Sequence, residues 1–242
     1  MKYLVAFGCS HTNGSMLDGK NGSSEYNVRN GFPAIIANEY NYNLINISKP
    51  GGSNQYIHRS IVEFLTHYYD PDNEYLFLIN WSSRNRLELR YKEDTSDKHT
   101  TLGDYTDKKA VPFTAGTDPK LFSDPKIINL LNFTPYLLDD TLEADKWACW
   151  AYGVQQMLQY KNIPYLMSNT CEPMVVTDTN KEIIKQLDTS RYIGPTDQNS
   201  VMINYLFQRG YEKTPCWHYK IDGHQAWAKK LRNHLRELRY VE

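Results

Sequence analysis

The sequence predicts an α/β protein, a three-layer α/β/α sandwich around a mostly parallel sheet. Short apolar runs alternate with helical patterns over residues 2–81, which is typical of parallel strands joined by helices on both faces. A length of 242 residues favours a single domain, residues 1–242, over two domains. With 40% hydrophobic and 23% charged residues, the chain has the composition of a globular protein with a sizeable core.

The first strand is predicted over residues 2–7, an apolar run that ends at Gly8. Small polar residues follow at once, among them Ser10, Thr12 and Asn13. Ligands of α/β proteins bind at the carboxyl edge of the sheet, so we expect the Ser10 hydroxyl to be presented there, beside backbone N–H groups. The same residues also suit a helix cap, and this stretch by itself leaves both interpretations open.

The remaining elements follow from periodicity and from helix and turn signals. Residues 15–30, rich in Gly, Asn and Ser, are predicted to be a loop. Helices are predicted over residues 31–40, 56–69, 140–160, 181–187, 201–209 and 223–240, and strands over 43–48, 74–81 and 164–169.

Residues 82–136 break the alternation, and we expect an irregular insertion there with one short helix. A long stretch of this kind is either functional, such as a lid over the site, or a solvated arm that docks a partner.

Charge and cysteine usage exclude several classes of protein. Lys and Arg number 27 against 28 Asp and Glu, a net charge of -1, which argues against a nucleic-acid partner. No secretory signal, polybasic tract or membrane-spanning apolar run is present, so no membrane partner is expected. The four cysteines are distant in sequence and form no Cys-x-x-Cys pair, which indicates neither a zinc site nor a disulfide scaffold.

The opening residues carry a family resemblance. Residues 7–14, Phe-Gly-Cys-Ser-His-Thr-Asn-Gly, resemble the first block of the SGNH (GDSL-type) hydrolases, in particular divergent members found in phage genomes. The resemblance implies a flavodoxin-like topology and Ser10 as the nucleophile. Cys9 stands where the family pattern has Asp.

Two later stretches resemble the blocks that supply oxyanion donors in this family. Counted from the strand end at Asn46, Gly51 matches the oxyanion glycine better than Gly52, although a plain Pro-Gly-Gly turn explains both residues. The family's Gly-x-Asn-Asp is missing after the third strand. The resemblance therefore implies a donor from the polar residues there, namely Ser82, Ser83 or Asn85.

The base is expected near the C-terminus, where the family places a histidine before the last helix. The pattern His-Pro-x-x-x-Gly-His of many relatives favours His218 over His224, with Tyr219 in place of the proline. The rival alignment treats Asp222-Gly-His224 as a shortened Asp-x-x-His. With His218 as the base, Pro215 occupies the place of the carboxylate that orients the imidazole, and Asp222 is a candidate substitute.

The resemblance implies a serine esterase or acetylhydrolase that acts on O-acyl groups, for example those of a carbohydrate, without a cofactor or metal. Its expected partner is a small acyl ester or an acylated glycan. The departures from the family pattern motivate an alternative: a catalytically weak or inactive phage structural or carbohydrate-binding protein, whose partners include other virion proteins. The expected location is cytoplasmic or virion-associated.

Overall fold

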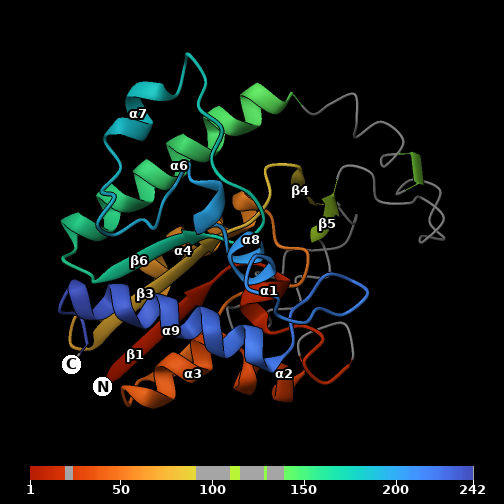
Figure 1. Ribbon diagram of the computed structural model, residues 1–242. Coiled ribbons are helices and arrows are strands. Elements are labelled where there is room, and N and C mark those ends of the chain that lie inside the picture. Colours follow the sequence, from red (N-terminus) through yellow and green to blue (C-terminus); the bar gives the residue numbers. More distant parts are fainter. Residues whose placement is uncertain (20–23, 91–109, 115–127, 130–138, 242) are drawn as a thin grey trace, which may run out of the picture.

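The protein is built on a four-stranded parallel sheet (Figure 1). A computed structural model describes residues 1–19, 24–90, 110–114, 128–129 and 139–241. The sheet has the order β2-β1-β3-β6, and each neighbouring pair is parallel. Its strands are β1 (Lys2–Phe7), β2 (Asn43–Asn46), β3 (Glu74–Trp81) and β6 (Tyr165–Asn169). Counted along the chain this order is 2-1-3-4, so the predicted α/β class and flavodoxin-like strand order are confirmed.

The inner strands β1 and β3 are mostly apolar after their exposed first residues, because both of their faces are covered. Successive side chains of a strand point to opposite faces, and in β1 they accordingly divide between two separate cores. Val5 and Phe7 join one core, whereas Leu4 and Ala6 join the other. Near-continuous burial of this kind is what a parallel sheet between two helical layers requires.

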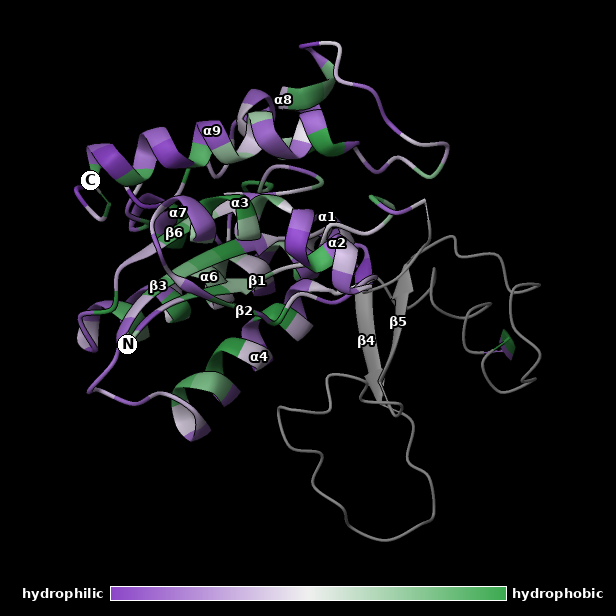
Figure 2. Ribbon diagram, turned by 90° about the horizontal axis from the view of Figure 1, so that it is seen from below, coloured by the Kyte–Doolittle hydropathy of each residue, from purple (hydrophilic) through white to green (hydrophobic). Residues whose placement is uncertain are grey.

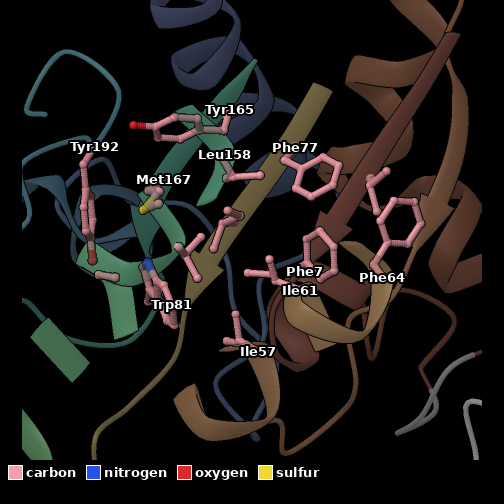
Figure 3. Close-up of a cluster of buried hydrophobic side chains, with 14 of the residues drawn as sticks. Phe7, Ile57, Ile61, Phe64, Phe77, Trp81, Leu158, Tyr165, Met167 and Tyr192 are labelled. Carbon is pink, nitrogen blue, oxygen red and sulfur yellow. The ribbon is translucent and has the colours of Figure 1, made fainter. Parts of the chain in front are cut away.

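Helices α4 (Asn54–His67) and α6 (Asp140–Tyr160) cover one face of the sheet. Their apolar residues pack with Phe7, Phe77 and Trp81 in the first core, part of which is drawn in Figure 3. Phe7 and Phe77 lie 5.2 Å apart between ring centroids, and the edge of Phe64 from α4 completes this aromatic group.

Helices α3 (Phe32–Glu39) and α9 (Ile221–Glu237) cover the opposite face. In α9, Trp227, Leu231 and Leu235 recur at helical spacing and are buried. Figure 2 shows the resulting contrast between the hydrophobic strands and the hydrophilic residues of α9. Shorter helices complete the described chain: α1 (Ser10–Asn13), α2 (Glu25–Asn30), α7 (Lys181–Lys185), α8 (Met202–Phe207) and a 3-10 turn over Gln198–Ser200.

Two sequence-based expectations are corrected. The predicted loop over residues 15–30 contains helix α2, because the Ser24 hydroxyl accepts a hydrogen bond from the Asn27 N–H and caps the helix. The insertion after residue 82 contains an antiparallel pair, β4 (Arg86–Arg90) and β5 (Ala110–Thr114). Pairing between segments so far apart leaves no local signal in the sequence. The expected lid falls largely outside the described residues.

No helix in the described part of the chain is both long enough and apolar enough to cross a bilayer.

Candidate functional site

Four polar turns meet at the carboxyl edge of the sheet, because all four strands run in the same direction. Hydrogen bonds tie the turns together. The Asn13 side chain donates to the Ser48 carbonyl (3.2 Å), which joins the turns after β1 and β2. The Ser82 N–H donates to the Asn54 side chain (2.7 Å), which joins the end of β3 to the start of α4. These two bonds connect the turns after β1, β2 and β3 at this edge.

Ser10 opens helix α1 directly after β1, at the position that the sequence predicts. Gly8 makes this tight turn possible, because a Cβ at residue 8 would lie 2.1 Å from the Thr12 hydroxyl oxygen. Ser10 is 5% exposed. Among the described residues, its hydroxyl makes no hydrogen bond to His218 or His224.

His218 lies over the turn that carries Ser10. Its ring stacks on that of His11, the neighbour of Ser10, with the centroids 4.6 Å apart and the planes at 26°. The loop is held by the Thr214 N–H, which donates to the His218 carbonyl (2.7 Å), and Trp217 takes a positive φ of 68°. Neither ring nitrogen of His218 reaches hydrogen-bond geometry with another described residue, although the Cys216 backbone lies close enough to raise the pKa of the ring. Burial lowers the pKa of His218, while the Cys9 sulfur partly opposes this, so the imidazole is neutral near pH 7.

His224 has a different role. It lies inside the first turn of α9, 1% exposed, and its Nδ1 accepts a hydrogen bond from the Phe32 N–H at 3.2 Å. It thereby satisfies a free donor at the start of α3. Burial lowers its pKa to about 3, with smaller contributions from His11 and His218. Asp222, the second candidate here, accepts from the Gly223 N–H (2.8 Å), and no hydrogen bond joins it to His218 within the part of the chain that the structure describes.

The two candidate glycines differ in what their N–H groups do. Gly52 donates its N–H to the Lys49 carbonyl (2.9 Å) inside the turn. Gly51 has a φ of 75°, a conformation that favours glycine, and its N–H has no partner among the described residues. The turn therefore uses the Gly52 N–H and not the Gly51 N–H.

The candidates after β3 are also unequal. The Ser83 hydroxyl donates to Glu172 (3.0 Å), and the Asn85 N–H donates to that same hydroxyl oxygen (3.2 Å). The Ser82 hydroxyl accepts from Arg86 (2.9 Å) and keeps its own proton free to donate. The Asn85 side-chain amide makes no hydrogen bond to another described residue, so Ser82 and Asn85 are less engaged than Ser83.

Sequence analysis missed three neighbours of this site. His11 follows Ser10 directly and was treated only as part of the motif. Cys171, which follows β6, lies within hydrogen-bonding reach of the Cys9 thiol although the two are distant in sequence. Arg86 reaches the same place from the start of β4. Only His11 had a usable signal, its position beside the serine.

The pKa values of Cys9 and His11 are shifted by burial and by their neighbours. The hydrogen bond from Cys171 lowers the pKa of Cys9 well below its usual range, against the effect of burial, and Arg86 and His11 lower it further. Burial lowers the pKa of His11 to about 4. No group of three or more His, Cys, Asp or Glu side chains in the described part of the chain is arranged to hold a metal ion.

Comparison with known proteins gives a family without an assigned function. The chain belongs to a family described as a family of unknown function (DUF6071), whose model matches residues 15–242 and so begins after the Ser10 turn. A search of curated proteins finds no match.

Among solved structures, the chain is similar to the psychrotrophic esterase EstA from Pseudoalteromonas sp., with 10% identity, 98% of each chain covered and a TM-score of 0.48. It is also similar to a member of the lipolytic protein G-D-S-L family from Veillonella parvula, with 13% identity, 96% and 97% coverage and a TM-score of 0.43. A third is the acetyl xylan esterase Est2A from Butyrivibrio proteoclasticus, with 13% identity and a TM-score of 0.48. That match covers 98% of this chain and 64% of Est2A.

Proposed function

We propose that this protein is a serine ester hydrolase that removes O-acyl groups, with Ser10 as the nucleophile and His218 as the base. One observation carries the proposal: the His218 ring stacks at 4.6 Å on His11, the residue next to Ser10. The stacking brings the His218 ring to the turn that carries Ser10, where a neutral imidazole is the group that can accept the serine proton.

In the proposed reaction the Ser10 hydroxyl oxygen attacks the acyl carbon and His218 takes the hydroxyl proton. His218 then gives this proton to the departing alcohol, which leaves an acyl ester on Ser10. A water molecule, deprotonated by His218, releases the acid and restores the serine. The lowered pKa of His218 keeps the imidazole neutral near pH 7, as a base must be.

The negative oxygen formed during attack needs donors placed in advance. The N–H groups of Ser10 and Gly51 are the backbone candidates, and Ser82 or Asn85 supplies a side-chain donor. Ser83 is the weaker candidate because its hydroxyl already donates to Glu172.

The orientation of the base departs from the usual triad. No carboxylate is hydrogen-bonded to His218 among the described residues, so stacking on His11 is what fixes the ring plane. Loss of the orienting carboxylate costs a large factor in well-known triads, so a slow enzyme is expected. Its substrate class is a small acyl ester or an acylated carbohydrate.

The test combines a fluorophosphonate probe, which labels activated serines, with hydrolysis of p-nitrophenyl acetate. The parent protein should be labelled once per chain, and Ser10→Ala and His218→Ala should abolish both signals. Ser190→Ala, an exposed serine outside the site, and His67→Ala, an exposed histidine of α4, serve as matched controls and should behave as the parent. Labelling of Ser10→Ala at the parent's rate would refute the proposal.

A second candidate function is non-catalytic binding of a carbohydrate, either as a phage structural protein or as a free binding module. It is favoured by two exposed aromatic side chains beside the His218 loop, Trp217 (67% exposed) and Phe207 (65% exposed). The Lys213 ammonium lies 3.2 Å from the Trp217 ring centroid and 5.0 Å from that of Phe207, which groups the two rings. Polysaccharide retention that survives Ser10→Ala and disappears in Trp217→Ala would support this function, and retention unchanged by Trp217→Ala would exclude it.

A further inference from the structure

Two cysteines from distant parts of the chain meet beside Ser10. Cys9 lies directly before Ser10 and is fully buried, and its carbonyl accepts a hydrogen bond from the Asn13 N–H (3.0 Å). Cys171 follows β6 and is half-buried. Strands β1 and β6 lie on either side of β3, and the residues that follow them converge here, so that the two free thiols lie within hydrogen-bonding reach of each other. The proposed hydrolysis uses neither thiol.

Hydrogen bonds to the end of β3 hold Cys171 from both sides. The preceding residue, Thr170, donates its N–H to the carbonyl of Trp81, the last residue of β3 (2.8 Å). The following residue, Glu172, accepts a hydrogen bond from the Arg84 N–H (2.6 Å). A disulfide joins two cysteines without backbone movement only where the chain already presents their side chains to each other, as it does here.

The charges around the pair distinguish its two members. The Arg86 guanidinium donates to the Ser82 hydroxyl (2.9 Å) and lies within hydrogen-bonding reach of Cys9. The hydrogen bond from Cys171 and the charge of Arg86 lower the pKa of Cys9 well below its usual range, although burial opposes them. The same hydrogen bond and burial raise the pKa of Cys171 well above its usual range. A thiolate beside a thiol is the arrangement in which the first sulfur reacts with an oxidant and the second closes a disulfide.

We propose that Cys9 and Cys171 are a redox-active pair, which a peroxide converts into a disulfide directly beside Ser10. The Cys9 sulfur attacks one oxygen of the peroxide, the O–O bond breaks and hydroxide leaves. The sulfur is thereby oxidised to a sulfenic acid and the peroxide is reduced. The Cys171 sulfur then attacks the Cys9 sulfur and the S–O bond breaks. The departing hydroxide takes the Cys171 proton and leaves as water.

The disulfide also changes the surroundings of His218. Burial lowers the pKa of His218, whereas the negative Cys9 sulfur raises it and the charge of Arg86 lowers it. A disulfide sulfur carries no charge, so oxidation removes the one influence of these three that favours the protonated ring. Oxidation should therefore lower the pKa of His218 further. An effect of this change on ester hydrolysis rests on the proposed function, but the formation of the disulfide does not.

The first experiment maps the disulfide. The two exposed cysteines are replaced together, as Cys149→Ser with Cys216→Ser, so that only the pair can react. The reduced protein is treated with hydrogen peroxide, which is small enough to enter a buried site, and its peptides are mapped by mass spectrometry without reductant. We expect one linked pair of peptides, from Cys9 and Cys171, that dithiothreitol separates. A folded, peroxide-treated protein without this linked pair would refute the proposal.

Single variants in the same background test the order of the steps. In Cys171→Ala, Cys9 should stop at the sulfenic acid, which dimedone traps. In Cys9→Ala, Cys171 should stay reduced under the same conditions. Oxidation of Cys171 at an unchanged rate in Cys9→Ala would contradict the assignment of Cys9 as the sulfur that reacts first. If either variant does not fold, the peptide map of the background protein decides.

A further variant tests the contribution of the neighbouring cation. Arg86→Gln should slow disulfide formation by about tenfold, because the cation beside Cys9 is lost. The matched control is Arg29→Gln, since Arg29 lies on the surface in α2 and pairs only with the exposed Glu25 among the described residues. This control should form the disulfide at the parent's rate. An equal rate in Arg86→Gln would show that Arg86 does not activate Cys9.

The last experiment follows the link to His218 and separates this proposal from the hydrolase. NMR titration of the histidine Cε1–H signals, with His218 assigned from His218→Gln, should give a lower midpoint in the oxidised than in the reduced protein. Equal midpoints would refute the link. If the disulfide forms but the reduced parent does not cleave p-nitrophenyl acetate, the proposed function fails and the redox pair stands. If the parent cleaves the ester but no disulfide forms, the redox pair fails and the hydrolase stands.

Discussion

The polar groups at the two edges of the parallel sheet differ in how exposed they are and in how they are hydrogen-bonded. At the amino edge, polar groups pair with near neighbours: the N-terminal ammonium donates to Asn73 (2.9 Å), and Lys2 forms an ion pair with Glu74 (3.1 Å). Asn73 in turn donates to Asp70 (2.8 Å). These groups are exposed, so water satisfies whatever the protein leaves unpaired.

At the carboxyl edge, many polar atoms are buried and have no hydrogen-bond partner among the described residues. Such atoms are found on His11, Thr12, Asn13, Asn46, Asn54, Asn80, Trp81, Thr170 and His218. Buried polar groups normally find partners, because leaving one unpaired costs free energy. These atoms lie together at the carboxyl edge, whereas the polar groups named at the amino edge are exposed and paired.

The largest expected effect is the loss of the proposed ester hydrolysis at the carboxyl edge, with the fold retained. Ser10→Ala should lower kcat/KM for p-nitrophenyl acetate by at least about a thousandfold. The free energy of unfolding should stay within about 1 kcal/mol of the parent, because no bond of the hydroxyl to either histidine is lost. A large drop in urea stability would instead make Ser10 a structural residue.

The next largest expected effect is a loss of stability when the core between the two edges is changed. Phe77→Ala should reduce the free energy of unfolding by roughly 3–5 kcal/mol, because it empties the space between Phe7 and Phe64. Urea denaturation measures the loss. A cost under about 1 kcal/mol would contradict the packing described for this face.

The carboxyl edge should also make stability depend on pH. The pKa of His224 falls from 6.5 to about 3 on folding, so in the unfolded chain this group binds its proton first as the pH drops. The stabilisation is complete above pH 6.5 and is lost progressively as the pH falls toward 3. Since one pKa unit corresponds to about 1.4 kcal/mol, the loss by pH 4 is roughly 3 kcal/mol.

His224→Gln is the matched variant for this pH dependence. The Gln side-chain oxygen can still accept from Phe32, but it does not titrate. In urea unfolding between pH 7 and pH 4, the stability of the parent should fall relative to that of His224→Gln, by roughly 3 kcal/mol at pH 4. Parallel curves would show that His224 does not contribute.

The smallest expected effects are changes in stability when one buried hydroxyl of the carboxyl edge and one exposed ion pair of the amino edge are removed in turn. Thr170→Val at the carboxyl edge removes a buried hydroxyl that has no partner among the described residues, and should raise stability by about 1 kcal/mol. Lys2→Met at the amino edge breaks an exposed ion pair and should change stability by less than about 0.5 kcal/mol. If Thr170→Val destabilises the protein, its hydroxyl has a partner and the contrast weakens.

Much of the fold could be predicted because its signals are local. The strands β1 and β3 and the helix α6 have the predicted bounds, since apolar runs and helical periodicity are written into neighbouring residues. Helix α2 was missed because its single cap, Ser24, lies in a stretch of turn-forming residues. The β4–β5 pair was missed because strand pairing joins residues that are remote in sequence.

The candidate site likewise has one part that the sequence predicted and another that depends on the tertiary structure. The sequence by itself determined the position of Ser10 after the first strand, because a strand and its turn depend on adjacent residues. The alternation of strands and helices also predicted the parallel main sheet. Only the tertiary structure decided that His218 stacks on His11 while His224 caps α3, and that Arg86 and Cys171 reach Cys9. The physical reason is that these neighbours come from distant segments of the chain, namely the turns after β1, β3 and β6, the loop before α9 and α9 itself, whose side chains meet only once the sheet and both helical layers have packed.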